Sequence, residues 1–271
     1  MEKININKEF FLRDLNKVRE IKPLVHNITN YVVMNNTANA LLAVGASPVM
    51  AHSVEEVEEM AGIASSLVLN IGTLEPQWIE AMIKAGKVAK SKGIPVVFDP
   101  VGAGATSYRT RSCVEILNEV HPEIIRGNAS EIVALAAANQ VKTRGVDSTL
   151  ASEDAIEFAA AFAKENNLVV SISGAVDYIT DGSKIYQVTN GSEKLVQVTG
   201  LGCTATAITG SFAAVNPNRL EAAAHAMLLM GCAGEKAASY SKGNGSLQLN
   251  FLDELCNFDE TLLNELTDGR F

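Results

Sequence analysis

Two short segments combine charged residues with glycine in a way that suits phosphate and metal binding. Asp99 ends the apolar run 94–98 and is followed by a loop with two glycines, 100–104. Arg126 precedes a segment that supplies the amide of Asn128 and the carboxylate of Glu131. Mg²⁺ prefers carboxylate oxygens, and a guanidinium offers several donors to phosphate oxygens. Each segment alone is more often a helix cap or a surface ion pair, but together they favour a site for Mg²⁺ and a polyphosphate.

A third segment, 200–205, has the composition of an anion hole. Gly200 and Gly202 precede a run of small residues that predicts a helix over 203–215. Backbone N–H groups at a helix N-terminus attract negative charge, and a cysteine there can have a lowered pKa. Cys203 is therefore expected to have partial thiolate character. The alternative is a tight turn that is followed by a buried cysteine.

Common nucleotide-binding patterns do not account for this segment. The P-loop pattern GxxxxGK[ST] is absent from the chain, which excludes a P-loop NTPase. Residues 200–205 match the loose dinucleotide pattern GxGxxA, and Glu221 follows about 20 residues later. That pattern belongs in the first βα turn, whereas here it follows six predicted strands. A nucleotide-dependent oxidoreductase is therefore only a distant alternative.

An uncharged set of residues falls at the ends of other predicted strands. Its members are Asn30, Met50, Gly72 and Thr73. A pocket with few polar groups suits a small, mostly apolar organic molecule better than a sugar. Ordinary loop chemistry and core packing of the methionine are the alternative reading.

The elements that position these residues alternate along the chain. Short runs rich in β-branched residues predict strands at 23–28, 47–50, 67–71, 95–99, 123–127 and 168–173. Helical spacing predicts helices at 30–44, 53–66, 75–92, 152–166, 203–215, 219–241, 246–256 and 259–266. Residues 175–180 and 184–189 flank an Asp-Gly turn and predict an antiparallel hairpin. The pattern predicts an α/β fold with a mostly parallel central sheet, flanked by helices, and an appended hairpin.

Composition limits the class of protein further. The chain has 271 residues and a formal net charge of −9, which disfavours nucleic acid as a partner. Hydrophobic residues make up 47%, enough for a large core, yet no stretch approaches the roughly 18 apolar residues of a membrane span. The first residues lack the apolar core of a signal peptide, so a cytoplasmic protein without membrane contact is expected. No linker divides the chain, which predicts one domain over 1–271.

The four cysteines lie far apart and form no CxxC pair, so neither a zinc knuckle nor a disulfide framework is indicated. We expect the three cysteines other than Cys203 to be small buried residues.

Taken together, the motifs resemble those of the hydroxyethylthiazole kinase family. The resemblance runs in order from about residue 15 to about residue 255. Its motifs are 26–32 (HNITNYV), 36–39 (NTAN), 45–51 (GASPVMA), 70–74 (NIGTL), 99–104 (DPVGAG), 126–131 (RGNASE) and 200–203 (GLGC). One departure is Asn27, where many relatives would have cysteine. Residues 257–271 match nothing in the family pattern.

The resemblance implies a ribokinase-like fold and a thiamine-salvage enzyme. Such an enzyme moves the γ-phosphoryl group of ATP to the hydroxyethyl group of 5-(2-hydroxyethyl)-4-methylthiazole with Mg²⁺, and the family forms homotrimers with active sites at subunit boundaries. In the wider ribokinase-like group a GxGD motif supplies an aspartate base, and this family has cysteine there.

The resemblance also assigns roles to residues of this chain. Cys203 would be the catalytic position, and Gly202 and Gly200 would form the anion hole. Met50, Asn30, Gly72 and Thr73 would line the thiazole pocket together with Gly200. Arg126, Ser173 and Asn128 would contact ATP, while Asp99 and Glu131 would serve the Mg²⁺ region.

Two alternatives stay open. A sister kinase of the same fold could act on hydroxymethylpyrimidine or pyridoxal, although cysteine in place of aspartate and the set around Asn30 and Met50 favour thiazole. A ribokinase-like protein without activity could bind a ligand as a regulator, although the polar positions that the chemistry needs are all occupied.

Overall fold

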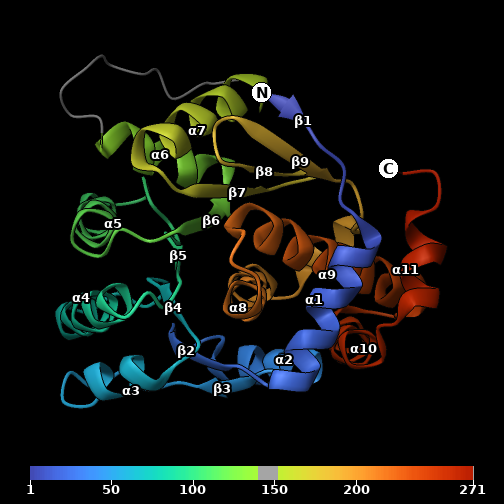
Figure 1. The fold of residues 1–271 in the computed structure, drawn as a ribbon, viewed down its shortest axis with the longest axis horizontal. Coiled ribbons are helices and arrows are strands. Elements are labelled where there is room, and N and C mark those ends of the chain that lie inside the picture. The colour runs from blue at the N-terminus through green and yellow to red at the C-terminus, as the bar shows by residue number, and fades with distance from the viewer. Residues whose placement is uncertain (140–151, 271) are drawn as a thin grey trace.

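The computed structural model of the chain describes residues 1–139 and 152–270, and its strands within those ranges form one nine-stranded sheet (Figure 1). The order across the sheet is β1-β9-β8-β7-β6-β5-β4-β2-β3. The strands are β1 (Glu2–Lys3), β2 (Leu24–Ile28), β3 (Ser47–Val49), β4 (Ser66–Asn70), β5 (Val96–Asp99), β6 (Ile124–Asn128), β7 (Val169–Ser173), β8 (Asp177–Thr180) and β9 (Lys184–Val188).

The direction of the strands confirms the predicted fold class. Strands β2 to β7 all run parallel to one another, whereas β8 pairs antiparallel with both β7 and β9. The hairpin turns at Asp181, whose carboxylate accepts hydrogen bonds from the backbone N–H groups of Ser183 and Lys184. The predicted parallel strands all form, with ends within a residue or two of the predicted ones.

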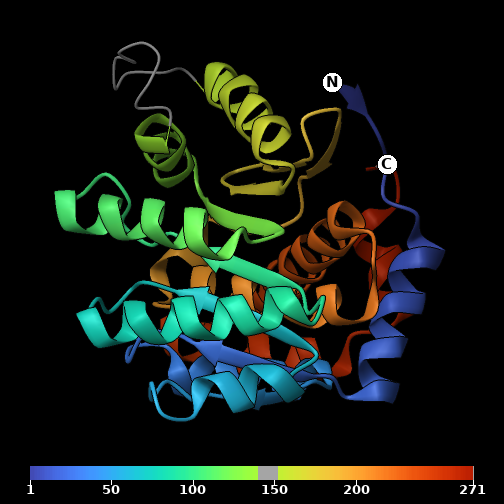
Figure 2. The same cartoon turned by 60° about the vertical axis from the view of Figure 1, so that its left-hand side comes forward.

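Helices cover both faces of the sheet. They are α1 (Lys8–Ile21), α2 (Met34–Val44), α3 (Val57–Ile63), α4 (Pro76–Ser91), α5 (Ser107–Val120), α6 (Ala129–Asn139), α7 (Ser152–Asn166), the short 3₁₀ helix η1 (Glu193–Gln197), α8 (Leu201–Val215), α9 (Arg219–Tyr240), α10 (Asn244–Asn257) and α11 (Glu260–Thr267). Figure 2 shows the cyan-to-green helices α3 to α5 stacked on one side and the blue α1 with the orange and red helices on the other.

The sheet is buried on both faces, which explains why its strands are continuous apolar runs. In β4, Leu67 and Leu69 pack with the helices α3 to α7, while Val68 between them packs with α1, α2 and α8 to α11. This follows from the alternation of side chains across a strand. The result is three layers with a core on each face of the sheet.

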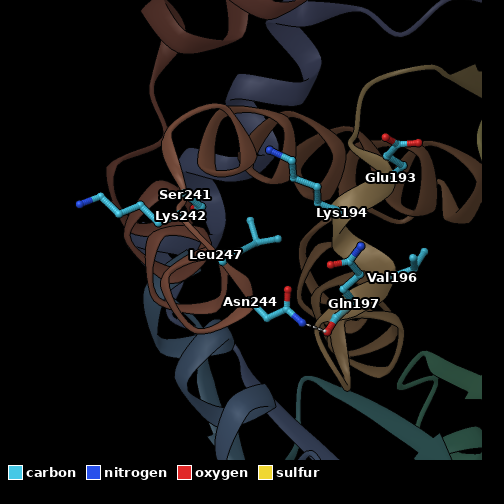
Figure 3. A pocket seen from close by; sticks show the side chains of 9 residues that line it. Glu193, Lys194, Val196, Gln197, Ser241, Lys242, Asn244 and Leu247 are labelled. Carbon is cyan, nitrogen blue, oxygen red and sulfur yellow. Dashed lines mark hydrogen bonds between the residues drawn. The ribbon is translucent and has the colours of Figure 1, made fainter.

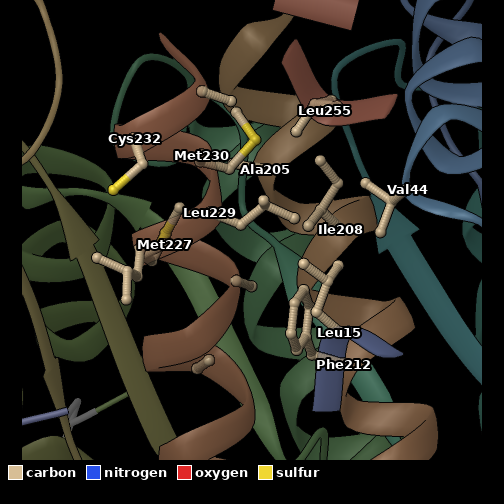
Figure 4. Packing of buried hydrophobic residues seen from close by; sticks show 14 of the residues in the cluster. Leu15, Val44, Ala205, Ile208, Phe212, Met227, Leu229, Met230, Cys232 and Leu255 are labelled. Carbon is tan, nitrogen blue, oxygen red and sulfur yellow. The ribbon is translucent and has the colours of Figure 1, made fainter. Parts of the chain in front are cut away.

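Helix α8 is the central helix of one layer, and nearly all of its residues are buried. It packs against α9, α2 and the strands β4 and β5. In Figure 4, Ile208 and Phe212 of α8 point towards Leu15 of α1 and Val44 of α2. Its small residues let the helix lie close to the sheet, and this brings its N-terminus to the strand ends.

Several sequence-based boundaries were wrong. Helices α1, α5 and α6 were not predicted. In α1 and α5, many charged and polar residues obscure the stripe of buried apolar residues. Helix α2 begins at Met34 rather than at residue 30, since 30–33 form a turn in which the Val33 N–H bonds to the Asn30 carbonyl. Helix α3 is shorter than predicted, covering 57–63 rather than 53–66.

The cysteines only partly match expectation. Cys113 and Cys232 are buried and free, but Cys256 is exposed, so the expectation of a third buried cysteine was wrong. Cys256 lies near the end of α10 on its solvent side. Of the helices in the described part of the chain, none is long and apolar enough to cross a membrane.

Candidate active site

The candidate site lies where the strand order reverses. The chain runs from β2 outward to β3 and then back past β2 to β4, and α2 and α4 cover opposite faces of the sheet. Loops after such neighbouring strands diverge and leave a crevice at the carboxyl edge, which is where open α/β sheets bind ligands. Asn30 follows β2, and Asn70 ends β4.

A chain of side-chain hydrogen bonds runs along this edge of the sheet. Asn30 Nδ2 lies 3.5 Å from Cys203 Sγ and donates to Asn70 Oδ1 at 2.8 Å. Asn70 Nδ2 in turn donates to Asp99 Oδ2 at 2.8 Å, and the Thr206 hydroxyl donates to the same oxygen at 2.7 Å. Three strand ends and the first two turns of α8 are therefore joined by one polar network.

Asp99 is the buried acid of this network, with 2% of its surface exposed. Burial raises the pKa of its carboxyl group to about 6, and the positive charge of Arg126 and the hydrogen bonds from Thr206 and Asn70 act in the opposite direction. Its other oxygen, Oδ1, accepts no hydrogen bond from the described residues. That oxygen is available to a cation or to a water molecule.

Cys203 lies in the first turn of α8, as predicted, but its chemistry differs from the prediction. Burial, and then the negative charge of Asp99, raise the pKa of the thiol to about 11, and hydrogen bonding to Asn70 and Asn30 only partly compensates. The expected thiolate character was therefore wrong. At neutral pH the group is a neutral thiol held beside an amide, because burial outweighs the field of the helix N-terminus.

Gly200 sets the geometry at the start of α8. It is the residue before the helix and has φ of 87°, in the left-handed region that favours glycine. A Cβ atom there would lie 2.5 Å from Val33 Cγ1, so a side chain has neither the conformation nor the space. The glycine lets the first turn of α8 present its N–H groups at the strand edge, where the sequence predicts an anion hole.

Arg126 joins this first turn to the sheet. Its Nη1 donates to the Gly202 carbonyl oxygen at 2.8 Å, and the residue is 8% exposed. Its Nε has no hydrogen-bond partner among the described residues. The carboxylates of Asp99 and Asp177 interact with this guanidinium, and its unpaired Nε–H remains available as a donor to a phosphate ligand.

A cavity of about 730 Å³ opens beside Arg126. One end of the cavity is polar and contains Arg126, Asn128, Ser173, Asp177, Thr199, Gly200 and Gly202. The other end is apolar and contains Leu195, Val198, Ala205, Met227 and Met230. A volume of this size, with Arg126 at its polar end and an apolar opposite end, suits a nucleotide, with the phosphates towards α8 and the base towards α9.

Glu131 and Asn128 are engaged in local bonds at the start of α6. Glu131 accepts from the Gly102 N–H at 2.8 Å and from the Asn128 N–H at 2.9 Å, one bond to each carboxylate oxygen. The Asn128 side chain accepts from Ser130 Oγ and from the Glu131 N–H, as a helix cap does. The carboxylate of Glu131 thereby fixes the glycine loop after β5 and adds negative charge near Asp99.

The residues of the site that could bind a metal ion are the carboxylates of Asp99 and Glu131. Among residues 1–139 and 152–270, no group of three or more His, Cys, Asp or Glu side chains could hold a metal ion. Mg²⁺ in phosphoryl-transfer sites is commonly held by one or two carboxylates together with phosphate oxygens and water. Asp99, with its unused Oδ1, could bind Mg²⁺ directly. Glu131, whose two oxygens accept hydrogen bonds, would contribute negative charge nearby.

The uncharged set lies at the same edge but outside the lining of the cavity. Asn30 is buried, and Met50 follows β3, the outermost strand on that side. Gly72 donates its N–H to Asn70 Oδ1 at 2.9 Å, and the Thr73 hydroxyl accepts from the Tyr31 N–H at 3.3 Å. The structure thus brings Asn30, Gly72 and Thr73 together near Cys203, with Met50 at the neighbouring strand end.

Three residues of the site were missed from the sequence. Asn70 and Thr206 complete the network, and Arg109 of α5 donates to the carbonyl oxygens of Ile71, Val101 and Gly72 at 2.8 to 2.9 Å. Asn70 was visible in a quoted motif but was assigned no role. Nothing local in the sequence marks Thr206 or Arg109, because Asp99 lies far along the chain from Thr206, and Ile71 and Gly72 lie far from Arg109.

A second hollow, of about 640 Å³, lies on the other side of η1 (Figure 3). Lys194 and Gln197 of η1 face Lys242, Asn244 and Leu247 across it, and Asn244 Nδ2 donates to the Gln197 carbonyl oxygen at 3.1 Å. It shares Glu193 and Val196 with the larger cavity. None of the predicted site residues lines it.

Solved structures of low sequence identity share this fold. A ribokinase-like superfamily protein from Enterococcus faecalis V583 superposes with a TM-score of 0.68 at 12% identity, covering 96% of each chain. A Staphylococcus aureus pyridoxal kinase gives 0.60 at 15%, over 82% of this chain and 91% of the other. The chain therefore has the α/β fold that the ribokinase-like superfamily protein shows.

Closer similarities define the family. Residues 15–261 match the model of the hydroxyethylthiazole kinase family. Hydroxyethylthiazole kinases of Syntrophus aciditrophicus and Leptospira biflexa are 56% and 54% identical, each over 90% of this chain and 90% and 91% of their own. The structure of hydroxyethylthiazole kinase protein from Pyrococcus horikoshii OT3 has a TM-score of 0.87 at 45% identity, over 94% of this chain and 96% of that one. The chain belongs to the hydroxyethylthiazole kinase family.

Proposed function

We propose that this enzyme transfers the γ-phosphoryl group of ATP to the hydroxyethyl group of 5-(2-hydroxyethyl)-4-methylthiazole, with residues 1–271 acting as one kinase domain. The observation that carries the proposal is the bond from Arg126 Nη1 to the Gly202 carbonyl. It places an incompletely paired guanidinium and the first turn of α8 between a nucleotide-sized cavity and the Cys203 thiol. The γ-phosphate of ATP and the hydroxyl group of the thiazole would meet at the first turn of α8.

The nucleotide half of the site consists of Arg126, Ser173 and Asn128. The guanidinium would bind phosphate oxygens with its unused donors, while Ser173 and Asn128 would contact the nucleotide from neighbouring strand ends. Mg²⁺ bound with the nucleotide would neutralise phosphate charge, with Asp99 and Glu131 supplying the carboxylates on the protein side. Asp99 favours binding a cation in its ionised form, which its pKa of about 6 allows at neutral pH.

The acceptor half consists of Asn30, Met50, Gly72, Thr73 and Gly200. These residues would hold the thiazole so that its hydroxyl lies beside Cys203 and the N-terminus of α8. Phosphoryl transfer through a loose transition state depends chiefly on positioning and on neutralising charge. The N–H groups of Gly202 and Cys203 would stabilise charge on the transferred group. The neutral thiol of Cys203 would then orient the hydroxyl by a hydrogen bond, and only its small thiolate fraction would accept the hydroxyl proton as a base.

We further propose that the enzyme is a homotrimer located in the cytoplasm, where ATP is available. Tyr31 and Val32 follow Asn30 directly and are 57% and 69% exposed. Large apolar side chains in that position support a subunit contact beside the acceptor half. Light scattering after size-exclusion chromatography tests the trimer, and a monomer at assay concentration would contradict it.

The function is tested by ADP release from Mg-ATP with purified protein. The assay is run with hydroxyethylthiazole and, separately, with hydroxymethylpyrimidine and pyridoxal. We expect thiazole-dependent ADP release and a product with the mass of thiazole phosphate. Release with the pyrimidine or pyridoxal alone would identify a sister kinase instead. No release with any acceptor, together with measurable thiazole binding, would indicate a binding protein.

A further inference from the structure

One wall of the large cavity is the loop between β9 and η1, and it has little internal support. Asn190, Gly191 and Ser192 all line the cavity. Gly191 has φ of 146°, within the region that residues with a side chain rarely adopt. Ser192 is held by the Lys194 N–H of the adjoining η1, whereas Asn190 and Gly191 are held by bonds from outside the loop.

Those bonds come from Glu235 of α9. Its Oε2 accepts from the Gly191 N–H and from Asn190 Nδ2, both at 3.2 Å. Burial alone would raise the pKa of Glu235, but the hydrogen bonds from Arg270, Gly191 and Asn190 outweigh it and hold the pKa below its ordinary value. The ionised carboxylate is therefore the form that holds the loop.

Glu235 is itself oriented by Arg270. The guanidinium donates from Nη1 to Oε2 and from Nη2 to Oε1, both at 2.8 Å, which is the two-bond geometry that fixes a carboxylate in one plane. A second link joins the same region to the loop, because Asn190 Nδ2 also donates to the Leu266 carbonyl oxygen of α11 at 3.0 Å. Residues 266 and 270 both lie beyond the family match, which ends at residue 261.

We propose that the segment 262–270 positions the nucleotide-facing loop 190–192, with Arg270 acting through Glu235. Arg270 is a positioning residue, since its guanidinium bonds to Glu235 and it is not among the residues that line the cavity. This role rests on the proposed function, because the cavity is assigned to ATP there. It gives residues 262–270, which the family pattern leaves unassigned, a part in nucleotide affinity.

The test compares Arg270→Ala with Lys8→Ala. Lys8 Nζ binds Asn264 Oδ1 and Asp268 Oδ1 and so ties the same segment to α1, away from the cavity. Both variants lose an ion pair of the segment, and Arg270 is partly exposed, so folding is retained. Deleting 260–270 is a poorer test because it removes the buried Leu263.

For Arg270→Ala we expect the Kd of Mg-ADP, measured by calorimetry without acceptor, and the KM for ATP to rise about two- to fivefold. The kcat and the KM for the thiazole should stay unchanged. Lys8→Ala should leave all four quantities unchanged, and Arg270→Lys should give an intermediate Kd, since a lysine cannot form both bonds.

Three results would overturn the proposal. These are an unchanged Kd in Arg270→Ala, an equal rise in Lys8→Ala, and a fall in kcat without a change in Kd. Wild-type protein that bound no adenine nucleotide would contradict the proposed function itself and, with it, the positioning role. The calorimetric measurement on the wild type therefore separates the two kinds of failure.

Discussion

The amide of Asn70 lies against the carboxylate of Asp99, with 2.8 Å between Nδ2 and Oδ2. The carbonyl oxygen of the same amide accepts from Asn30 Nδ2 and from the Gly72 N–H. One buried side chain at the end of β4 thus fixes the orientation of an acid on one neighbouring strand and of an amide on the other. The proposed metal region and the proposed acceptor pocket consequently both depend on the side chain of Asn70.

Replacing Asn70 should impair both halves together. For Asn70→Ala we expect kcat/KM for the thiazole and for ATP to fall about tenfold or more, with a loss of about 1–3 kcal/mol in the free energy of unfolding, because buried polar partners lose their hydrogen bonds. Steady-state kinetics and urea unfolding measure the two effects. Asn39→Ala removes an exposed asparagine of α2 as a control. A fall in kcat/KM for only one of the two substrates would contradict the role of Asn70 in both halves of the site.

The Cys203 thiol should be unreactive at neutral pH and should not be indispensable. With a pKa of about 11, its alkylation by iodoacetamide should increase with pH well beyond 9. The measurement needs a Cys256→Ser background, since Cys256 is exposed. Cys203→Ala should lower kcat without abolishing it, and Cys203→Asp should raise kcat if access to a base limits the step. A Cys203→Ala variant with the wild-type kcat would remove the thiol from the reaction.

Asp99 should make stability depend on pH. Its pKa rises from 3.8 to about 6 on folding, so between those values the folded state binds more protons than the unfolded chain. The free energy of unfolding therefore falls as pH rises through this window, by up to about 3 kcal/mol from this group.

Urea unfolding without Mg²⁺ or nucleotide, between pH 4 and 7, tests this dependence. Asp99→Asn should lose this part of the pH dependence, whereas Asp177, whose pKa burial also raises to about 6, keeps its own contribution in both proteins. Parallel curves for wild type and Asp99→Asn would show that Asp99 titrates normally.

Arg126 should act mainly on the nucleotide and its transferred phosphate. We expect Arg126→Ala to reduce kcat/KM for ATP by about a hundredfold, because a preorganised donor to a developing charge is lost. Arg111→Ala, an exposed arginine of α5, serves as the matched control. An unchanged kcat/KM for ATP in Arg126→Ala would exclude the guanidinium from the site.

The sequence predicts the parallel strands well because strands buried on both faces are short, uninterrupted apolar runs, as in 66–70 and 124–128. From this the strand ends follow, and so do Asn30, Gly72, Asp99 and Arg126 as site candidates. Helix α5 was missed because its first turns are polar and its buried residues, such as Cys113 and Ile116, begin only in the second turn.

The residues that support the site, Thr206 and Arg109, could not be predicted from the sequence for a different reason. Thr206 bonds to Asp99, 107 positions away, and Arg109 bonds to Ile71, 38 positions away, as well as to the nearer Val101, so no local pattern reveals the long-range contacts. The error at Cys203 has the same origin. A helix N-terminus can be predicted from sequence, but the burial and the nearby Asp99 charge that raise the thiol pKa arise only in the folded chain.

The placement of the two halves of the site has a kinetic consequence. The proposed acceptor residues Asn30, Gly72 and Thr73 lie outside the lining of the cavity that contains Arg126 and Ser173, and the first turn of α8 lies between the two groups. Each substrate can then enter and leave while the other is bound. Initial rates should therefore follow a random order of addition, with a ternary complex and no obligatory first substrate.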